Sequence, residues 1–578
     1  MITIDLNGLW DFIVDLDPKY HYSENSPYAR PNWDRSNWQK VPVPGVWNKY
    51  AERLDIYEGI CWFVREFNIE SLDDRSISVL RFGGINYKCR IFLNGELIRT
   101  HEGGYTEFTA DVTGEIQIGK NCLAIEVDNR ATHIKMPPCL GYFNYGGIHR
   151  NVTLEIHQKP DCIRDVFFDA KPTDDGGGII RVRGRIIGCN NCVGIKLICN
   201  GYKTISELSN RRSFDISMNV PNVKLWSPDS PNLYKATIQL IQGDSIAHEI
   251  SRDIGFRSIE MSNGKIILNK KPTFLKGICY LYDSPIYGVT MKPDQYMTDI
   301  ALFKELGINT IRSHFPFANE FYEACDREGI MIWIETPIYC IHPPDNKLQS
   351  DFADPDFREL AITMTEEMII QARSHPSVII YSLGNECNVE HPEAESFFQE
   401  LANKARELDD TRLLSYASLY CNVGSLANMV DVLGINEYWG WYDRIDNHDE
   451  KSPTKPIDLN MLNQKLNELK HIHNKSLLLT EFGADSIPNY ISGSCNLWSE
   501  DYHADLIEET FKIIRNHPEI CGAFPFCFSD YRDPSKYTNK YWDEMNYKGI
   551  VTYNRLPKKA FYRLKGIYNA FLSDYNKQ

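Results

Sequence analysis

The sequence has no long apolar run and no leader-like start. No run of eighteen apolar residues occurs, and Met1–Asp5 shows no basic region followed by an apolar core. A membrane-spanning helix needs about 20 mostly apolar residues, and a secretory signal needs both of the missing features. We therefore expect no membrane partner and a cytoplasmic location.

Basic blocks are equally scarce. The formal net charge is -16, from 62 lysines and arginines against 78 aspartates and glutamates, and no basic cluster stands out. A protein that binds nucleic acid needs concentrated positive charge to neutralise phosphates. The sequence therefore predicts no nucleic-acid partner.

Ligand clusters for metals and cofactors are missing as well. The 16 cysteines are scattered through strand-like and helix-like stretches, which is typical of reduced, buried thiols. Cys189 and Cys192 have the spacing of a zinc-ligand pair, but no second Cys or His pair accompanies them, and their flanks resemble a hairpin turn. Since no glycine-rich phosphate loop occurs either, we expect no metal and no cofactor.

With 578 residues, 43% of them hydrophobic, the chain is too large for one core. Residues 1–160 consist of short alternating segments separated by turn signals such as Asn94-Gly95 and Gly103-Gly104. Residues 161–257 hold a second set of such segments at the spacing of a β-sandwich. The sequence therefore predicts two β-domains, 1–160 and 161–257.

After residue 257 the pattern changes, and apolar strand-like runs alternate with helical ones over residues 258–578. Eight such runs are the number expected of an (α/β)8 barrel. The runs are Phe274–Ile278, Thr310–Arg312, Ile330–Ile334, Val378–Tyr381, Leu413–Ser415, Val432–Ile435, Leu477–Leu479 and Gly522–Phe524.

Two glutamates follow closely on two of these runs. Glu386 comes after the fourth run, in Ser-Leu-Gly-Asn-Glu, and Glu481 after the seventh, in Leu-Leu-Leu-Thr-Glu. A carboxylate at the carboxyl end of a barrel strand points into the reaction face. Cleavage of a glycosidic bond needs two carboxyl groups in different protonation states, one to protonate the leaving oxygen and one on the opposite face of the sugar. The pair is therefore a candidate catalytic pair.

Ordered motifs along the whole chain resemble glycoside hydrolase family 2. This resemblance implies an N-terminal sugar-binding jelly roll, an immunoglobulin-like β-sandwich and a C-terminal TIM barrel. The motifs are Asn7–Phe12, Pro42–Gly45, Leu93–Gly95, His101–Tyr105, Tyr145–Arg150, Leu225–Pro228, Gly255–Arg257, Arg312–Pro316, Gly384–Glu386 and Thr480–Gly483.

The resemblance assigns roles to the pair. It implies that Glu386 is the acid/base and Glu481 the nucleophile, with a covalent glycosyl-enzyme and retention of the anomeric configuration. For Glu386 to act as an acid near neutral pH its pKa must be raised, to which repulsion between the two groups contributes, while Glu481 must stay ionised.

The same resemblance suggests the groups that position the substrate. Asn385 is expected to donate to the sugar 2-OH, and Tyr438 to lie beside the nucleophile. His314 is expected either to contact the sugar or only to orient other groups. Trp441 and Phe526 are candidates for a flat apolar floor, although either could equally be core.

Sugar specificity is suggested by Asn546 and Lys548. Met545–Val551 resembles the Asn-x-Lys signature with which β-glucuronidases of this family hold the C6 carboxylate. A carboxylate taken out of water needs a cation and a donor, which Lys548 and Asn546 supply. A neutral hexoside would leave Lys548 without its partner; alternatively, Lys548 pairs with a surface acid.

One departure from the glucuronidase pattern bears on the sugar. Gly141 stands where glucuronidases carry an aspartate that contacts sugar hydroxyls. If that aspartate reads an equatorial C4 hydroxyl, its loss leaves room for the axial C4 hydroxyl of a galacturonide. Arg532 is the candidate replacement contact.

We therefore expect a retaining exo-β-hexuronidase acting on small-molecule or oligosaccharide β-uronides, with glucuronides preferred to galacturonides. The alternatives are a β-galacturonidase, a neutral-sugar β-galactosidase and a non-catalytic carbohydrate-binding protein. The family resemblance also implies a homo-oligomer, a dimer or a tetramer.

Overall fold

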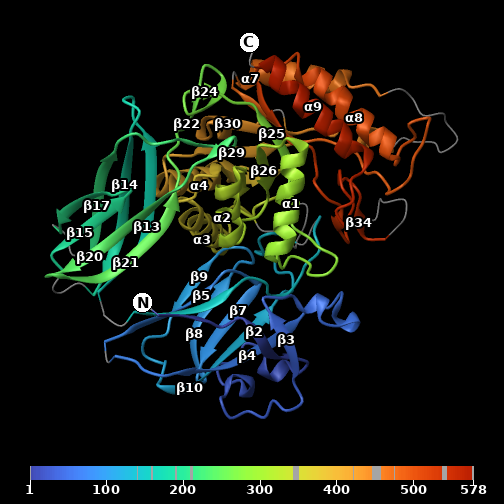
Figure 1. The fold of residues 1–578 in the computed structure, drawn as a ribbon. Coiled ribbons are helices and arrows are strands. Elements are labelled where there is room, and N and C mark those ends of the chain that lie inside the picture. Colours follow the sequence, from blue (N-terminus) through green and yellow to red (C-terminus); the bar gives the residue numbers. More distant parts are fainter. Residues whose placement is uncertain are drawn as a thin grey trace.

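A computed structural model gives the fold of residues 2–575, apart from 74, 139–140, 158–160, 189–191, 209–211, 343–350, 421, 446–456, 474 and 537–542. Cys189, one of the two cysteines weighed as zinc ligands, lies outside the described residues. Two β-domains precede a barrel surrounded by helices (Figure 1), and the predicted fold class is confirmed. Among the described residues, no helix is long and apolar enough to cross a membrane.

The N-terminal domain is built from a four-stranded sheet, β1-β12-β5-β9, and a six-stranded sheet, β3-β2-β4-β10-β7-β8. Alternate side chains of both sheets form one apolar core, in which Phe82 and Leu154 of the first sheet meet Phe63 and Leu123 of the second. The strands are β1 Ile2–Asp5, β2 Gly8–Val14, β3 Gln39–Val43, β4 Ile60–Ile69, β5 Ile77–Phe82, β6 Ile85–Asn86, β7 Lys88–Leu93, β8 Glu96–Glu102, β9 Phe108–Asp111, β10 Gly119–Asp128, β11 Gly147–Ile148 and β12 Val152–His157.

The second domain is a sandwich of the sheets β13-β14-β17 and β16-β15-β20-β21 around its own core. Trp226, fully buried, donates from Nε1 to the carbonyl of Asp326 at 2.8 Å and thereby joins the sandwich to the barrel. The strands are β13 Cys162–Pro172, β14 Gly178–Ile187, β15 Gly194–Cys199, β16 Tyr202–Glu207, β17 Ser213–Val220, β18 Trp226–Ser227, β19 Ser230–Pro231, β20 Tyr234–Gln242 and β21 Ser245–Ile254.

The third domain is a closed parallel barrel, β25 to β32, in which β25 also pairs with β32. Every residue of these strands is buried, as expected for strands covered on both faces. All eight predicted strand-like runs are barrel strands. Their bounds are β25 Leu275–Cys279, β26 Thr310–Ser313, β27 Met331–Glu335, β28 Val378–Asn385, β29 Leu413–Ser418, β30 Val432–Asn436, β31 Leu477–Glu481 and β32 Ile520–Ala523.

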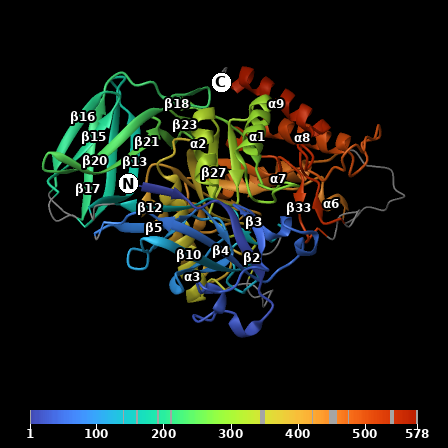
Figure 2. The ribbon, with the colours of Figure 1, turned by 60° about the horizontal axis from the view of Figure 1, so that its bottom comes forward.

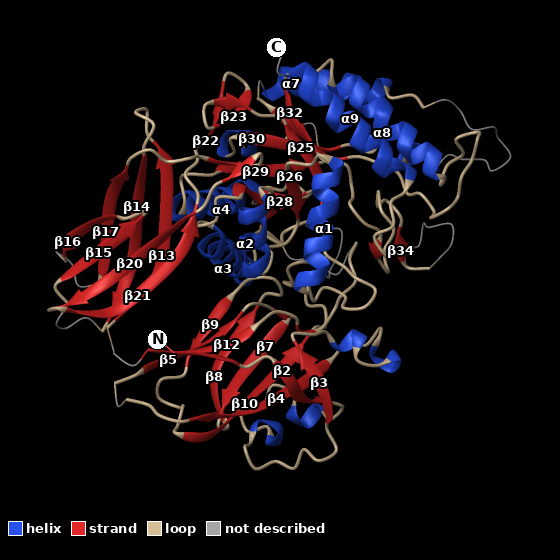
Figure 3. Cartoon of the chain, in the orientation of Figure 1, coloured by secondary structure: helices blue, strands red, loops and turns tan. Residues whose placement is uncertain are grey.

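Helices pack around the barrel (Figure 3), and short strands outside it form two small separate sheets, β22-β23-β24 and β33-β34. The helices are α1 Pro293–Leu306, α2 Asn319–Glu328, α3 Pro355–Ala372, α4 Ala394–Leu408, α5 Leu426–Met429, α6 Tyr442–Ile445, α7 Asn460–His473, α8 Glu500–Ile514 and α9 Lys559–Tyr575. The additional strands are β22 Ile259–Ser262, β23 Lys265–Leu268, β24 Lys271–Pro272, β33 Tyr531–Arg532 and β34 Met545–Asn546.

The N-terminal domain lies against the barrel in both views (Figures 1 and 2). His101 and Thr106 contact the carboxylate of Glu367 on α3, at 3.1 and 2.6 Å. The carbonyl of Pro138, in the loop before β11, accepts from the Tyr339 hydroxyl at 2.9 Å. This loop therefore reaches the carboxyl ends of the barrel strands.

Candidate active site

A cavity of about 360 Å³, here called the mouth cavity, lies where the barrel strands end. Its size is in the range of pockets for small-molecule ligands. Residues from β28, β30 and β31 line it, together with loops and the N-terminal domain. The lining residues are Gly141, Tyr142, His314, Tyr339, Cys340, Asn385, Glu386, Leu419, Asn436, Tyr438, Tyr442, Glu481, Phe526, Tyr531 and Lys548.

Glu386 directly follows β28, with a φ of +52° that non-glycine residues seldom adopt. Its Oε1 accepts a hydrogen bond from Asn436 Nδ2 at 2.6 Å. Burial raises the pKa of Glu386 to about 7, helped by the negative charge of Glu481 and opposed by the bond from Asn436. Glu386 is therefore suited to donate a proton near neutral pH.

Glu481, the last residue of β31, is in the opposite electrostatic situation. Arg312 donates to its Oε1 at 2.9 Å, and the Tyr438 hydroxyl donates to its Oε2 at 2.7 Å. Burial alone would raise its pKa, but the His314 contact and the positive charge of Arg312 outweigh burial and lower the pKa of Glu481 to about 2. Two carboxyl groups of one cavity are thus pushed into different protonation states, as a glycosidase requires.

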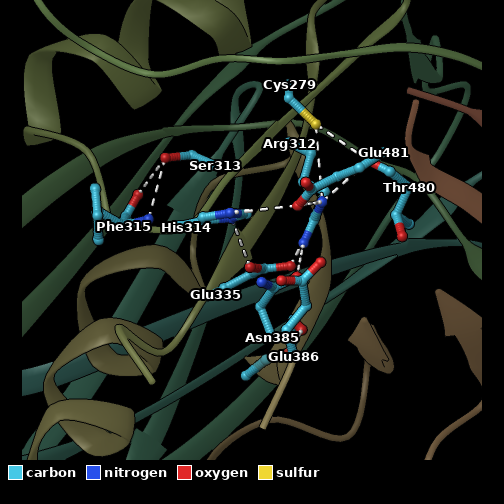
Figure 4. A network of polar contacts seen from close by, with 12 residues as sticks. Cys279, Arg312, Ser313, His314, Phe315, Glu335, Asn385, Glu386, Thr480 and Glu481 are labelled. Atoms are coloured by element: carbon cyan, nitrogen blue, oxygen red, sulfur yellow. Dashed lines mark hydrogen bonds and ion pairs between the residues drawn. The ribbon is translucent and has the colours of Figure 1, made fainter. Parts of the chain in front are cut away.

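A buried arginine holds this arrangement together (Figure 4). The guanidinium of Arg312 donates to Glu335 Oε1 at 2.8 Å, to Glu481 at 2.9 Å and to Asn385 Oδ1 at 2.7 Å. His314 lies between the same two glutamates, with Nδ1 2.9 Å from Glu335 and Nε2 3.4 Å from Glu481. Although burial lowers the pKa of His314, Glu335 outweighs this effect and raises it, so His314 favours its protonated form.

The side-chain amide nitrogen of Asn385 is the group that can face a ligand, because the side-chain oxygen is already occupied. Its carbonyl oxygen accepts from Arg312 and, at 2.9 Å, from Asn436 Nδ2. The NH2 group is the end left for a ligand, which agrees with the predicted donation to a sugar hydroxyl.

Three positioning groups were missed at the sequence level: Arg312, Glu335 and Asn436. Glu335 ends β27 and Asn436 ends β30, so the rule that found Glu386 and Glu481, a polar residue at a strand's carboxyl end, also applies to them. Arg312 lies inside β26, where an apolar residue is the default expectation.

The two candidate floor residues are placed differently. Phe526 lines the mouth cavity, with its ring 6.4 Å from the rings of His314 and Tyr438. Trp441 is fully buried behind the cavity and packs edge-on against Trp498 at 4.9 Å. Trp441 is therefore a core residue, whereas Phe526 lines the cavity, as expected of an apolar floor.

Lys548 reaches the mouth cavity from the segment after β34. Its Nζ donates to Asp485 Oδ2 at 2.6 Å and lies over the Tyr442 ring at 4.9 Å. The expectation that Lys548 has no anionic partner without a uronate is therefore wrong. Burial alone would lower the pKa of Lys548, but Asp485 raises it, so the ammonium stays charged.

Asn546 does not line the mouth cavity. Its Oδ1 accepts from the backbone N–H of Lys548 at 3.2 Å, and its Nδ2 donates to the Tyr531 hydroxyl at 2.9 Å. Asn546 therefore orients the backbone at Lys548 and the hydroxyl of Tyr531, a residue of the cavity wall. It is not positioned to contact a sugar directly.

Arg532 also lies outside the mouth cavity. Its guanidinium donates to Asp55 at 2.8 and 2.9 Å and covers the Phe143 ring at 3.7 Å. It lines a neighbouring cavity of about 440 Å³ between the N-terminal domain and the barrel, which shares the walls Tyr142 and Tyr531 with the mouth cavity. This placement argues against Arg532 as a replacement contact for a sugar hydroxyl.

Gly141 does line the mouth cavity, with a φ of +76° and open space where a Cβ would lie. Among the residues that the structure describes, no side chain occupies the position of a Cβ at Gly141. Within the described ranges, no group of three or more His, Cys, Asp or Glu residues has the geometry of a metal site.

Comparison with known proteins decides the family. Residues 4–160 match the sugar binding domain of glycosyl hydrolases family 2, residues 151–257 match glycosyl hydrolases family 2, and residues 259–572 match its TIM barrel domain. The chain belongs to glycosyl hydrolases family 2. It is therefore a glycosidase, and the non-catalytic alternative is excluded.

Relatives match over nearly the whole chain. A beta-glucuronidase from Paenibacillus borealis is 26% identical over 96% of this chain and 95% of its own length. The structure of a beta-glucuronidase from an uncultured Clostridium sp. is similar with a TM-score of 0.86, 25% identity and 98% of both chains covered. A beta-galacturonidase from Eisenbergiella tayi, bound to galacturonate, is similar with a TM-score of 0.83, 25% identity and coverage of 98% of this chain and 97% of that chain.

Proposed function

We propose that this family 2 glycosidase is a retaining exo-β-hexuronidase that hydrolyses terminal β-D-glucuronides. The observation that supports the sugar assignment is Lys548, whose ammonium lines the same cavity as Glu386 and Glu481. A buried ammonium at one end of a sugar-sized cavity favours a sugar that carries a carboxylate. The family relatives named beta-glucuronidase support the same assignment.

In the first step, ionised Glu481 attacks the anomeric carbon while Glu386 donates its proton to the glycosidic oxygen, and the aglycone leaves. The bonds from Arg312 and Tyr438 hold Glu481 in place for the attack. Asn385 donates to the 2-OH, a contact that strengthens as the transition state forms.

In the second step, the ester at Glu481 carries no charge, so the repulsion that raises the pKa of Glu386 disappears. Glu386 then acts as a base toward water, which attacks the anomeric carbon and releases the sugar with its configuration retained.

Hydrolysis of β-galacturonides is the second candidate, and one observation favours it. Gly141, which lines the mouth cavity, has open space where a Cβ would lie, and this space favours a sugar with an axial C4 hydroxyl. The similar structure of a family 2 beta-galacturonidase from Eisenbergiella tayi also supports this candidate.

Kinetics on four matched 4-nitrophenyl β-glycosides test both candidates. We expect kcat/KM on the glucuronide to exceed that on the galacturonide, with little turnover of the glucoside and galactoside. Proton NMR of the first-formed sugar should show the β-anomer before mutarotation. Turnover of the galactoside alone, or an α-anomer as first product, would contradict the proposal.

A further inference from the structure

Lys548 is not the only ammonium held by Asp485. Lys536 Nζ lies 3.2 Å from Asp485 Oδ2, the same oxygen that Lys548 contacts at 2.6 Å. All three side chains are buried: Asp485 and Lys548 almost completely, and Lys536 to about nine-tenths. Two ammonium groups therefore share one carboxylate oxygen inside the protein.

Both ammonium groups also face one ring of the mouth cavity. Tyr442, a lining residue, has Lys548 Nζ 4.9 Å and Lys536 Nζ 5.5 Å from its ring centroid. The pair is thus gathered at the end of the cavity formed by Tyr442 and Lys548. A group that reaches Lys548 from the cavity comes close to Lys536 as well.

The charges of this cluster do not cancel. Two cations against one anion leave one positive charge in a buried region, where an uncompensated charge is costly and like charges repel strongly. Two other carboxylates nearby in the chain do not supply the missing charge. Asp530 pairs with Lys558 at 2.7 Å, and Asp533 accepts from Ser535 at 2.5 Å and from Asn546 at 3.4 Å. In the part of the chain that the structure describes, neither Lys536 nor Lys548 is within ion-pair distance of Asp530 or Asp533.

A sugar carboxylate would complete the cluster, because its two oxygens offer one acceptor to each ammonium. We infer that Lys536 is a second specificity-determining residue, which receives the substrate carboxylate together with Lys548, and that Asp485 is the positioning residue that holds the two ammonium groups side by side. The expected substrate is then a sugar with one negative charge at C6. This inference rests on the function proposed above.

Replacement of Lys536 by Met separates this role from a structural one. The loss of one of two charged contacts should raise KM on 4-nitrophenyl β-D-glucuronide about 10- to 100-fold at nearly unchanged kcat, because the contact is made in ground and transition states alike. The inhibition constant of free D-glucuronate should rise by a similar factor. Inhibition by D-glucose, which lacks the carboxylate, should not change.

Two further variants serve as controls. Lys536→Arg keeps the charge and should recover most of the glucuronide affinity. Lys559→Met removes an ammonium that also pairs with a single carboxylate, Asp501, but that neither contacts Asp485 nor lies over a ring of the mouth cavity in the described part of the chain, and it should leave both inhibition constants unchanged.

The outcomes are distinct. If wild-type enzyme turns over only neutral glycosides, the proposed function fails and this inference fails with it. If wild-type enzyme is a uronidase but Lys536→Met leaves the D-glucuronate constant unchanged, or weakens D-glucuronate and D-glucose equally, Lys536 is not a carboxylate contact and only this inference is overturned.

Discussion

The two ends of the mouth cavity are built in different ways. The reaction end consists of Glu386, Glu481 and the groups around them, and it is carried by the ends of barrel strands β26, β27, β28, β30 and β31. The charge end consists of Lys548, Asp485 and Lys536, and each of these residues comes from a segment after β31 or β32. The reaction end is thus positioned by the ends of barrel strands, whereas the charge end is positioned by loops.

This difference agrees with the general division of labour in TIM barrels, where strand ends position the catalytic groups and loops vary. At the reaction end, burial raises the pKa of Glu386, whereas the His314 contact and the positive charge of Arg312 lower the pKa of Glu481. At the charge end, one carboxylate holds cations for the substrate. Changes at the two ends should therefore have separable kinetic effects.

The largest effect is expected at the reaction end. Glu481→Gln and Glu386→Gln should each lower kcat at least about 10³-fold on every accepted glycoside, because nucleophile and acid act in the chemical step. Glu437→Gln is the matched control: Glu437 is buried and paired with Lys465 at 3.1 Å but does not line the cavity. If steady-state kinetics show that Glu437→Gln lowers kcat as much as Glu386→Gln and Glu481→Gln, the assignment of Glu386 and Glu481 as the reacting pair is contradicted.

Arg312→Lys should have the next largest effect. Lysine keeps the charge but cannot hold Glu335, Glu481 and Asn385 in one fixed fork, so we expect kcat to fall about 10- to 100-fold on uronides and hexosides alike. Arg257→Lys alters a buried arginine whose guanidinium donates to the carbonyls of Pro376 and Val378, and it should lower Tm without this kinetic loss.

The pH profile should show the separated protonation states directly. Glu386 must be protonated in the free enzyme, and its pKa is raised to about 7, so kcat/KM should be full below pH 7 and fall tenfold per unit above it. Glu481 must be ionised, and its pKa is lowered to about 2, so no loss from this group is expected until the pH falls toward 2. An alkaline limb far from pH 7 would show that another group controls activity.

Asn436→Ala should have the smallest effect. Its hydrogen bond lowers the pKa of Glu386, so its removal should move the alkaline limb to higher pH, with kcat at the optimum reduced less than about tenfold. A shift of the alkaline limb to lower pH would contradict a hydrogen bond from Asn436 that stabilises ionised Glu386.

The same contrast explains what the sequence could predict. All eight barrel strands and the placement of Glu386 and Glu481 at one cavity follow from apolar runs and the polar residues at their ends, because strand order fixes which side chains meet. The sequence also singled out Lys548, but its pairing with Asp485 depends on how separate loops fold back, and no local pattern encodes that. The placement of Arg532 on Asp55 was unpredictable for the same reason, since the N-terminal domain supplies the partner.

The most direct test of the account is the glucuronide-to-glucoside ratio of kcat/KM for wild-type enzyme and for Lys548→Met. If Lys548 selects the substrate carboxylate, the wild-type ratio of glucuronide to glucoside kcat/KM should be high and should fall at least about 100-fold in the variant, with turnover of the glucoside unchanged. A variant that loses both activities in parallel, or a wild-type enzyme that prefers the glucoside, would show that Lys548 is structural and that this cavity does not select uronides.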